Sequence, residues 1–341
     1  MEVKQKGGLF YLGTHMAKSR RGDPSFRFDE ETWNSIVDKM AENGMNLMFL
    51  DIHEGLHYGS HPELAVEDAW TRQKMRRELG RLKEKGITVC PKLNFSACHD
   101  VWLGPYEKML STPKYYQVCR DLIRELSELF ADAPYFHIGM DEEDERHARS
   151  DKNFVAAFRQ GKQLWYDLQF LLDCVRDCGK TPVIWGCNPM YNYEVFKEHI
   201  SPEDLVIMHY YYHGVRPEHW TRTDSRDDYN RYYNVPGAFG GMGYAGQGME
   251  YIERDDPFYV YFNKNARQSA LDGYDVILCC SNYYQHPHNA EDVVEMITTT
   301  WPKERVKGII TCPWKPTLPQ YKDHHLEGIR LLGEACDKFG Y

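Results

Sequence analysis

The sequence predicts an α/β protein of the (β/α)8 TIM-barrel class, formed as a single domain by residues 1–341. Eight short apolar runs alternate with amphipathic segments, which is typical of βαβ units and a parallel sheet. Eight such units favour a closed barrel over an open doubly wound sheet. No glycine-rich phosphate fingerprint follows the first apolar run, which further disfavours a dinucleotide-binding fold.

The elements follow one another in a regular order. Residues 9–14 form the first predicted strand, and Asp29 is expected to cap a helix in which Trp33, Ile36 and Met40 recur at helical spacing. Later strands are predicted at 46–51, 87–93, 135–139, 182–187, 205–211, 276–281 and 308–312. Helices are predicted at 68–85, 119–129, 151–178, 290–300 and 326–332.

Residues 213–260 fit this alternation poorly. They are rich in Tyr, Arg, Asp and Gly, and we expect a long βα-loop insertion after the sixth strand. Such loops lie on the catalytic face of a barrel, so the insertion is a candidate lid. A strand hidden within it would shift the numbering of the last two strands.

Composition restricts the classes of ligand and location. The 51 acidic and 41 basic residues give a net charge of −10, and the basic residues are dispersed along the chain. This disfavours a nucleic-acid partner and favours a neutral or cationic small molecule. No apolar run reaches the length of a membrane span, and the first residues lack the apolar core of a secretion signal. We therefore expect a cytoplasmic protein with no membrane partner, and homo-oligomerisation stays open.

The ten cysteines lie mostly in apolar runs or helix-like stretches. This distribution indicates small buried side chains kept reduced, and no pair has a convincing zinc-ribbon spacing. We expect no metal and no cofactor.

In a parallel barrel the carboxyl-terminal ends of the strands meet in one mouth, so polar residues after each apolar run are the site candidates. They combine acids, histidines and flat aromatic rings, a mixture that suits a sugar. Asp141 and Glu142 would supply the two groups that glycosidic cleavage requires. On composition alone, an acidic run such as 141–145 is more often the start of a solvated helix. The candidates outside that run are His15, Asp51, His53, Glu54, Asn94, His99, Asp100, His137, Trp185, His209, Tyr210, Tyr211, Asn282, Tyr283, Tyr284 and Trp314.

Residues 135–142, Tyr-Phe-His-Ile-Gly-Met-Asp-Glu, resemble the signature of glycoside hydrolase family 20, the β-N-acetylhexosaminidases. In that family a strand ends in His-x-Gly-Gly-Asp-Glu. Four more segments are similar to the family in the expected order. They are 36–46 (first helix and entry to the second strand), 86–94 (third strand, ending near His99), 179–185 (fifth strand) and 310–314 (eighth strand).

The resemblance implies a retaining exo-glycoside hydrolase that acts on a terminal β-linked N-acetylhexosamine or a related sugar. Glu142 would be the general acid/base, and Asp141 would orient the substrate's 2-acetamido group, which itself attacks the anomeric carbon. One of Tyr283 and Tyr284 would hydrogen-bond the acetamide. The expected substrate-binding residues are His15, His53, Asn94, His99, His137, Trp185, Tyr211, Tyr283, Tyr284 and Trp314.

The chain also departs from the family pattern. Met140 replaces the second glycine of the motif, and His15 stands where the family has a sugar-gripping arginine. Tyr210 or Tyr211 replaces a tryptophan, and Lys315 replaces an acidic residue. The small domain that precedes the barrel in the family is not expected here. These changes predict related chemistry on a different sugar or linkage.

Two other functions stay open. One is a non-catalytic carbohydrate-binding barrel, which calorimetry would reveal as binding without product release. The other is a metal-dependent lyase or isomerase, which would need its ligands to converge on one ion and would lose activity with a chelator. The ligands in that case would be His53, Glu54, His99, His137 and Asp141.

Overall fold

The computed structural model describes residues 4–13, 28–143, 157–212, 265–283 and 287–341. All strand pairs are parallel, and the sheet closes in chain order because β1 pairs with both β2 and β8. The predicted (β/α)8 barrel is therefore confirmed. The strands are β1 (Gln5–Tyr11), β2 (Leu47–Asp51), β3 (Thr88–Lys92), β4 (Tyr135–His137), β5 (Thr181–Trp185), β6 (Val206–Tyr210), β7 (Asp275–Cys280) and β8 (Val306–Thr311).

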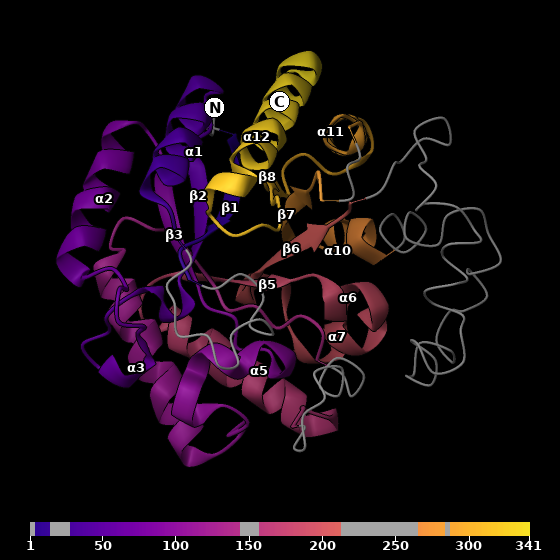
Figure 1. Cartoon of the computed structure of the whole chain (residues 1–341). Helices are drawn as coiled ribbons and strands as arrows, with labels where there is room; N and C mark the ends of the chain where they lie inside the picture. The colour runs from indigo at the N-terminus through magenta and orange to yellow at the C-terminus, as the bar shows by residue number, and fades with distance from the viewer. Residues whose placement is uncertain (1–3, 14–27, 144–156, 213–264, 284–286) are drawn as a thin grey trace, which may run out of the picture.

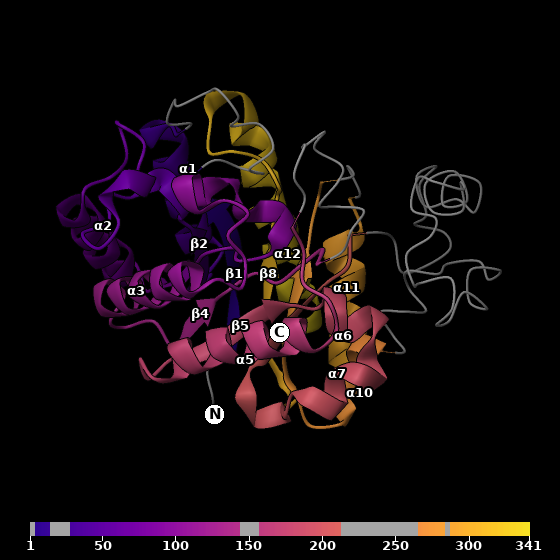
Figure 2. The ribbon, with the colours of Figure 1, turned by 90° about the horizontal axis from the view of Figure 1, so that it is seen from below.

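Helices surround the strands and complete the alternation (Figures 1 and 2). Helix α12 follows β8 and contacts α1, so the last helix closes the outer ring beside the first. The helices described are α1 (Glu30–Glu42), α2 (Arg72–Glu84), α3 (Pro113–Leu129), α5 (Gly161–Arg176), α6 (Cys187–Tyr191), α7 (Tyr193–His199), α10 (Arg267–Leu271), α11 (Asn289–Thr300) and α12 (Lys322–Phe339). Short 3-10 segments cover 53–55, 62–64, 97–106, 202–204 and 319–321.

The first helix begins where the sequence predicts it. Asp29 caps α1 as predicted, and its carboxylate accepts a hydrogen bond from the Thr32 amide at 2.7 Å. Trp33, Ile36 and Met40 recur along the helix and are buried, as expected for an amphipathic helix packed on a barrel.

The helix predicted over 151–178 is wrong at its start. Residues 157–160 are not helical, and α5 begins only at Gly161. Gln160 is extended and Gly161 has a left-handed φ of +52°, so the backbone breaks there. The fully buried Arg159 guanidinium also pairs with Glu143 and Asp167, each at 2.6 Å, and fixes residues 157–160. The insertion predicted over 213–260 lies outside the described residues.

The ten cysteines are free thiols, and all except Cys178 are buried. They pack as small apolar side chains, in agreement with the sequence-based interpretation. Among the described helices there is none with the length and apolar character of a membrane span.

Two buried histidines, His209 in β6 and His325 in α12, predict how the free energy of unfolding depends on pH. Burial lowers the pKa of His209 to about 3 and that of His325 to about 4. In the unfolded chain both return to about 6.5. The unfolded state then binds more protons between about pH 6.5 and 4, so the free energy of unfolding falls as the pH drops through this window.

Each of these histidines should contribute up to about 1.4 kcal/mol per pH unit. Urea denaturation between about pH 7 and 4 measures the slope. His325→Gln keeps a donor for the Pro316 carbonyl, which lies 3.0 Å from Nε2, and should reduce the slope. An unchanged slope in this variant would contradict the prediction.

Candidate functional site

The mouth of the barrel, where the carboxyl-terminal ends of the strands meet, holds Asp141 and Glu142 directly after β4. The chain reaches them through an unusual turn, because Gly139, Met140 and Glu142 have φ angles of +78°, +66° and +51°. Left-handed φ is costly for residues other than glycine and persists where the surroundings demand it. The turn directs both acidic side chains toward His99.

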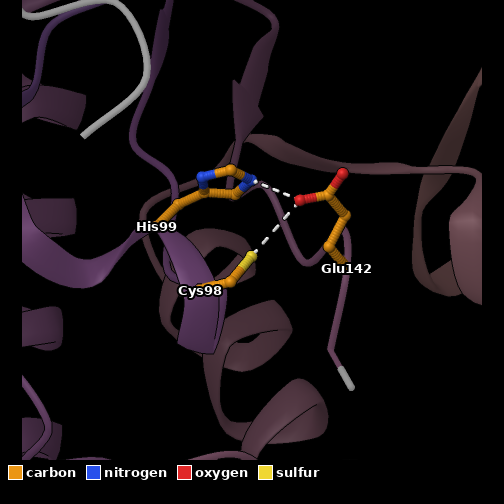
Figure 3. A group of neighbouring side chains, drawn as sticks. All are labelled: Cys98, His99 and Glu142. Carbon is orange, nitrogen blue, oxygen red and sulfur yellow. Dashed lines mark hydrogen bonds and ion pairs between the residues drawn. The ribbon is translucent and has the colours of Figure 1, made fainter. Parts of the chain in front are cut away.

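His99 joins the two carboxylates. Its Nε2 atom lies 3.2 Å from Asp141 Oδ2 and 3.2 Å from Glu142 Oε2. The Asp141 side chain is 14% exposed and that of Glu142 is 36% exposed. Figure 3 shows His99 and the neighbouring Cys98 pointing at the same Glu142 oxygen. The site therefore combines a shielded carboxylate with an adjacent one that solvent reaches.

Asp141 and His99 form a charged pair. Burial raises the pKa of Asp141, but the charge and hydrogen bond of His99 outweigh it and hold that pKa far below its usual range. Burial lowers the pKa of His99, yet Cys98 and Asp141 together raise it well above its ordinary value. Because burial also raises the pKa of Cys98 to about 12, its thiol is uncharged near neutral pH, and Asp141 supplies the charge that favours the imidazolium.

The loop after β3 orients the Asp141 carboxylate. Asn94 Nδ2 donates to Asp141 Oδ1 at 2.8 Å, and Ser96 Oγ lies 3.1 Å from the same oxygen. Asn94 is itself held by Ser96, whose amide and hydroxyl both donate to Asn94 Oδ1. Asp141 is thus an oriented anion: Asn94 and Ser96 lie against one carboxylate oxygen, and His99 lies against the other.

The third acid of the run has a different role. Glu143 is 4% exposed and accepts from Arg159 Nη1 and from the Ala97 amide, both at 2.6 Å. Arg159 continues to Asp167 of α5 and donates to the Tyr115 hydroxyl at 2.8 Å. The Glu143–Arg159 pair therefore ties the loop after β4 to the loop after β3. No sequence pattern pointed to Arg159 or to Ser96.

A second charged group lies at the ends of β2 and β3. Asp51 contacts the buried Lys92 ammonium through Oδ2 and lies 2.9 Å from His53 Nε2 through Oδ1. Burial raises the pKa of Asp51, but His53 and Lys92 outweigh it and hold the pKa low. His53 also stacks on Trp102, with ring centroids 5.2 Å apart. His53 is therefore engaged by an anion and an aromatic face.

His137 of β4 is held as a neutral imidazole. Burial and the neighbouring Lys92 charge lower its pKa well below the ordinary value. Its Nδ1 accepts from the Gly139 amide at 3.0 Å, which places the ring proton on Nε2. The His137 ring packs against Trp185, with the two ring centroids 4.8 Å apart.

The structure does not bring together the five ligands that a metal-dependent lyase or isomerase would need. Within the described residues, one group of at least three His, Cys, Asp or Glu places its ligand atoms within 4.8 Å of one another, and it consists of Cys98, His99 and Glu142. Of the five ligands, His99 alone belongs to it, and His53, Glu54, His137 and Asp141 are outside it.

Aromatic rings line the other side of the mouth. Trp185 of β5 is buried and lies 5.5 Å from Trp314, which follows β8 with a φ of +54°. The ring centroid of Tyr210 lies 6.0 Å from that of Trp185, and the ring centroid of Tyr212 lies 5.9 Å from that of Trp314. Tyr210 and Tyr211 were the two residues predicted to replace the family's tryptophan, and Tyr211 is 2% exposed. Because side chains alternate along the end of β6, Tyr210 and Tyr212 lie on one side and Tyr211 on the other.

Three predicted substrate-binding residues remain, His15, Tyr283 and Tyr284, and the structure describes one of them. The Tyr283 ring lies 4.9 Å from the Lys315 ammonium, which places a cation–π contact at the end of β7. His15 and Tyr284 lie outside the described residues.

Gly139 provides a test of how closely the two loops fit. A Cβ at Gly139 would lie 2.0 Å from Asn94 Oδ1 and 2.8 Å from Asn94 Cα, so Gly139→Ala should displace the Asn94 loop and reduce both stability and ligand binding. Gly179→Ala is the control, since Gly179 has a similar φ of +73° but no atom within 4 Å of its Cβ position. The control should lose only about 1–2 kcal/mol from its left-handed backbone, and chemical denaturation compares the two. Equal losses would show that the contact with Asn94 is unimportant.

Comparison with known proteins supports the fold. No family model and no curated protein matches the chain. Among solved structures, it is similar to the β-N-acetylhexosaminidase of Bacteroides fragilis NCTC 9343 (12% identity, 96% of this chain and 65% of that one, TM-score 0.61). It is also similar to the family 20 β-N-acetylhexosaminidase of Streptomyces coelicolor A3(2) (13%, 97% and 64%, 0.60) and to Dispersin B (13%, 98% and 98%, 0.56).

The chain spans less than two thirds of the length of the first two proteins and nearly all of the third. The likeness that residues 135–142 suggested therefore extends over the barrel, and the chain has the fold of the glycoside hydrolase family 20 β-N-acetylhexosaminidases.

Proposed function

We propose that this protein is a retaining exo-glycoside hydrolase that acts on a terminal β-linked N-acetylhexosamine or a closely related sugar. The observation that carries the proposal is the pair of adjacent carboxylates, Asp141 and Glu142, that share His99 at the barrel mouth. One is shielded and anionic, and the other is accessible, which matches the different tasks of the two groups in a substrate-assisted reaction.

In the first step the carbonyl oxygen of the sugar's 2-acetamido group attacks the anomeric carbon, and the bond to the leaving group breaks. Glu142 transfers its proton to the departing oxygen. Asp141 stabilises the positive charge that develops on the acetamide and orients its N–H. Asn94 and Ser96 hold Asp141 in place for this role.

In the second step Glu142, now a carboxylate, takes a proton from water, and the water oxygen attacks the anomeric carbon from the side the leaving group occupied. The ring of the intermediate opens, the acetamide is restored, and the product keeps its β configuration. The half-buried Trp314 ring would pack against a C–H face of the sugar, with the buried Trp185 ring 5.5 Å behind it, centroid to centroid.

The test is an array of chromogenic β-glycosides in pairs that differ only in the 2-acetamido group, with a thiazoline mimic of the intermediate as inhibitor. We expect hydrolysis of the 2-acetamido member and inhibition by the thiazoline. We also expect NMR of the product to show retention of configuration at the anomeric carbon. Equal hydrolysis of both members, or no thiazoline inhibition, would contradict the assisted mechanism. Sugar binding by calorimetry with no product would point to a carbohydrate-binding barrel instead.

A further inference from the structure

We propose that Cys98, His99 and Glu142 form a binding site for a zinc-like divalent cation, and that an ion bound there blocks the site. The three residues come from two loops at the mouth: Cys98 and His99 are consecutive in the segment after β3, and Glu142 follows β4 (Figure 3). The ion-binding part of the inference stands on geometry alone, and the blocking part rests on the proposed function.

Two of the three distances between the ligand atoms match a tetrahedral site, and the third is below 4.8 Å. Zn–N and Zn–O bonds of about 2.0 Å and a Zn–S bond of about 2.3 Å would place nitrogen and oxygen about 3.3 Å apart, and sulfur and oxygen about 3.5 Å apart. In the structure His99 Nε2 lies 3.2 Å from Glu142 Oε2, and Cys98 Sγ lies 3.6 Å from the same oxygen. All three atoms lie within 4.8 Å of one another. An ion therefore requires little movement of Glu142 relative to His99 and Cys98.

The ligand types select the kind of ion. A thiolate, an imidazole and a carboxylate are ligands that suit zinc, whereas magnesium and calcium prefer oxygen ligands alone. Three protein ligands leave the fourth position for water. Cys98 is 2% exposed and the Glu142 side chain 36% exposed, so we expect the water on the Glu142 side.

The two loops that carry the ligands are fixed to each other by neighbouring residues. Glu143 accepts a hydrogen bond from the Ala97 amide at 2.6 Å, so the residue after Glu142 is bonded to the residue before Cys98. Arg159 is fully buried and holds Glu143 from the other side. This arrangement limits the entropy lost when the ligands are brought together.

Binding displaces protons from two ligands. The Cys98 thiol and His99 Nε2 each release a proton to solvent, and one water of the hydrated ion stays in the fourth position while the others leave. The ion then occupies the Glu142 oxygen that the proposed hydrolysis uses as acid, and Nε2 can no longer donate to Asp141. Zinc and substrate should therefore exclude each other.

Calorimetric titration of the whole protein with zinc chloride tests the site without any substrate. We expect one saturable site per chain in the wild type. Cys98→Ala and Cys98→Ser should each weaken binding by about tenfold or more, and both should fold normally, as checked by thermal melting. Cys178→Ala removes the half-buried thiol near the end of α5 and should leave zinc binding unchanged.

Cobalt(II) gives an independent reading, because a cobalt–thiolate bond produces a charge-transfer band in the near ultraviolet. The band should appear in the wild type and in Cys178→Ala and be absent from both Cys98 variants. The proposal is overturned if the wild type shows no single saturable zinc site, or if the Cys98 variants bind zinc and cobalt as the wild type does.

Zinc inhibition of glycoside hydrolysis is measured separately. Inhibition competitive with substrate, and weaker in Cys98→Ser, supports the blocking part. Zinc binding without inhibition of an active enzyme overturns it. If the protein hydrolyses no glycoside, the proposed function fails while the titrations still decide the metal site, so the two failures are distinguishable.

Discussion

Glu142→Gln is expected to slow hydrolysis of β-glycosides with poor leaving groups by about 10²–10⁴-fold, the range that a general acid contributes. The amide has nearly the shape of the carboxylic acid but has no acidic proton for the departing oxygen. Substrate binding should change much less than turnover, because the loss falls on the transition state. Steady-state kinetics on alkyl and activated aryl glycosides measures both quantities.

The leaving group separates a chemical role for Glu142 from a structural one. A dinitrophenyl glycoside needs little protonation to depart, so its first step should be far less affected by Glu142→Gln. The matched control is Glu327→Gln, which changes an exposed carboxylate on α12 paired with Arg330 and should leave turnover unchanged. The assignment fails if Glu142→Gln hydrolyses alkyl glycosides at the wild-type rate.

Arg159→Met is expected to produce the largest loss of stability, about 3–5 kcal/mol, because removal of one partner leaves a charge uncompensated in the interior. Two buried carboxylates lose the cation they pair with and keep only uncharged donors: Glu143 is 4% exposed and Asp167 is 1% exposed. The loops after β3 and β4 should loosen together, so ligand binding at the mouth should weaken as well. Chemical denaturation measures the free energy of unfolding.

Arg330→Met is the control for removal of an arginine charge. Arg330 also pairs with two carboxylates, Glu327 and Glu334, at 2.7 and 2.6 Å, but its side chain is 41% exposed. Surface pairs contribute about 0–1 kcal/mol, so this variant should remain close to the wild type. Similar losses in both variants would show that burial of the Arg159 pairs is not the source of the effect.

The fold was predictable because its signals are local. The apolar runs that become β2, β3 and β7 end within one or two residues of their predicted bounds, and Asp29 caps its helix within the same few residues. The failure at 151–178 is also informative. Gly161 marks the break locally, since its φ of +52° is left-handed, and the buried pairs of Arg159 with Glu143 and Asp167 fix the residues before it.

The candidate site was predictable as a set of positions but not as an arrangement. Parallel strands end in one mouth, so Asp141, Glu142 and His99 could be chosen from the ends of the third and fourth strands. Sequence spacing does not tell which neighbours meet. The sequence therefore predicted no role for Cys98 at the mouth, although Cys98 Sγ lies 3.6 Å from Glu142 Oε2.

The amino-acid order alone determined the succession of strands and helices, the closed barrel, and the strand ends at which acids and aromatic rings lie. These features follow from the sequence because periodicity and capping act over a few neighbouring residues. Tertiary structure decided that one imidazole lies against both carboxylates, that Glu143 is buried against Arg159, and that Tyr210 and Tyr212 lie beside the tryptophans. These facts depend on loop conformation and burial, which arise only when segments separated by tens of residues pack together and exclude water.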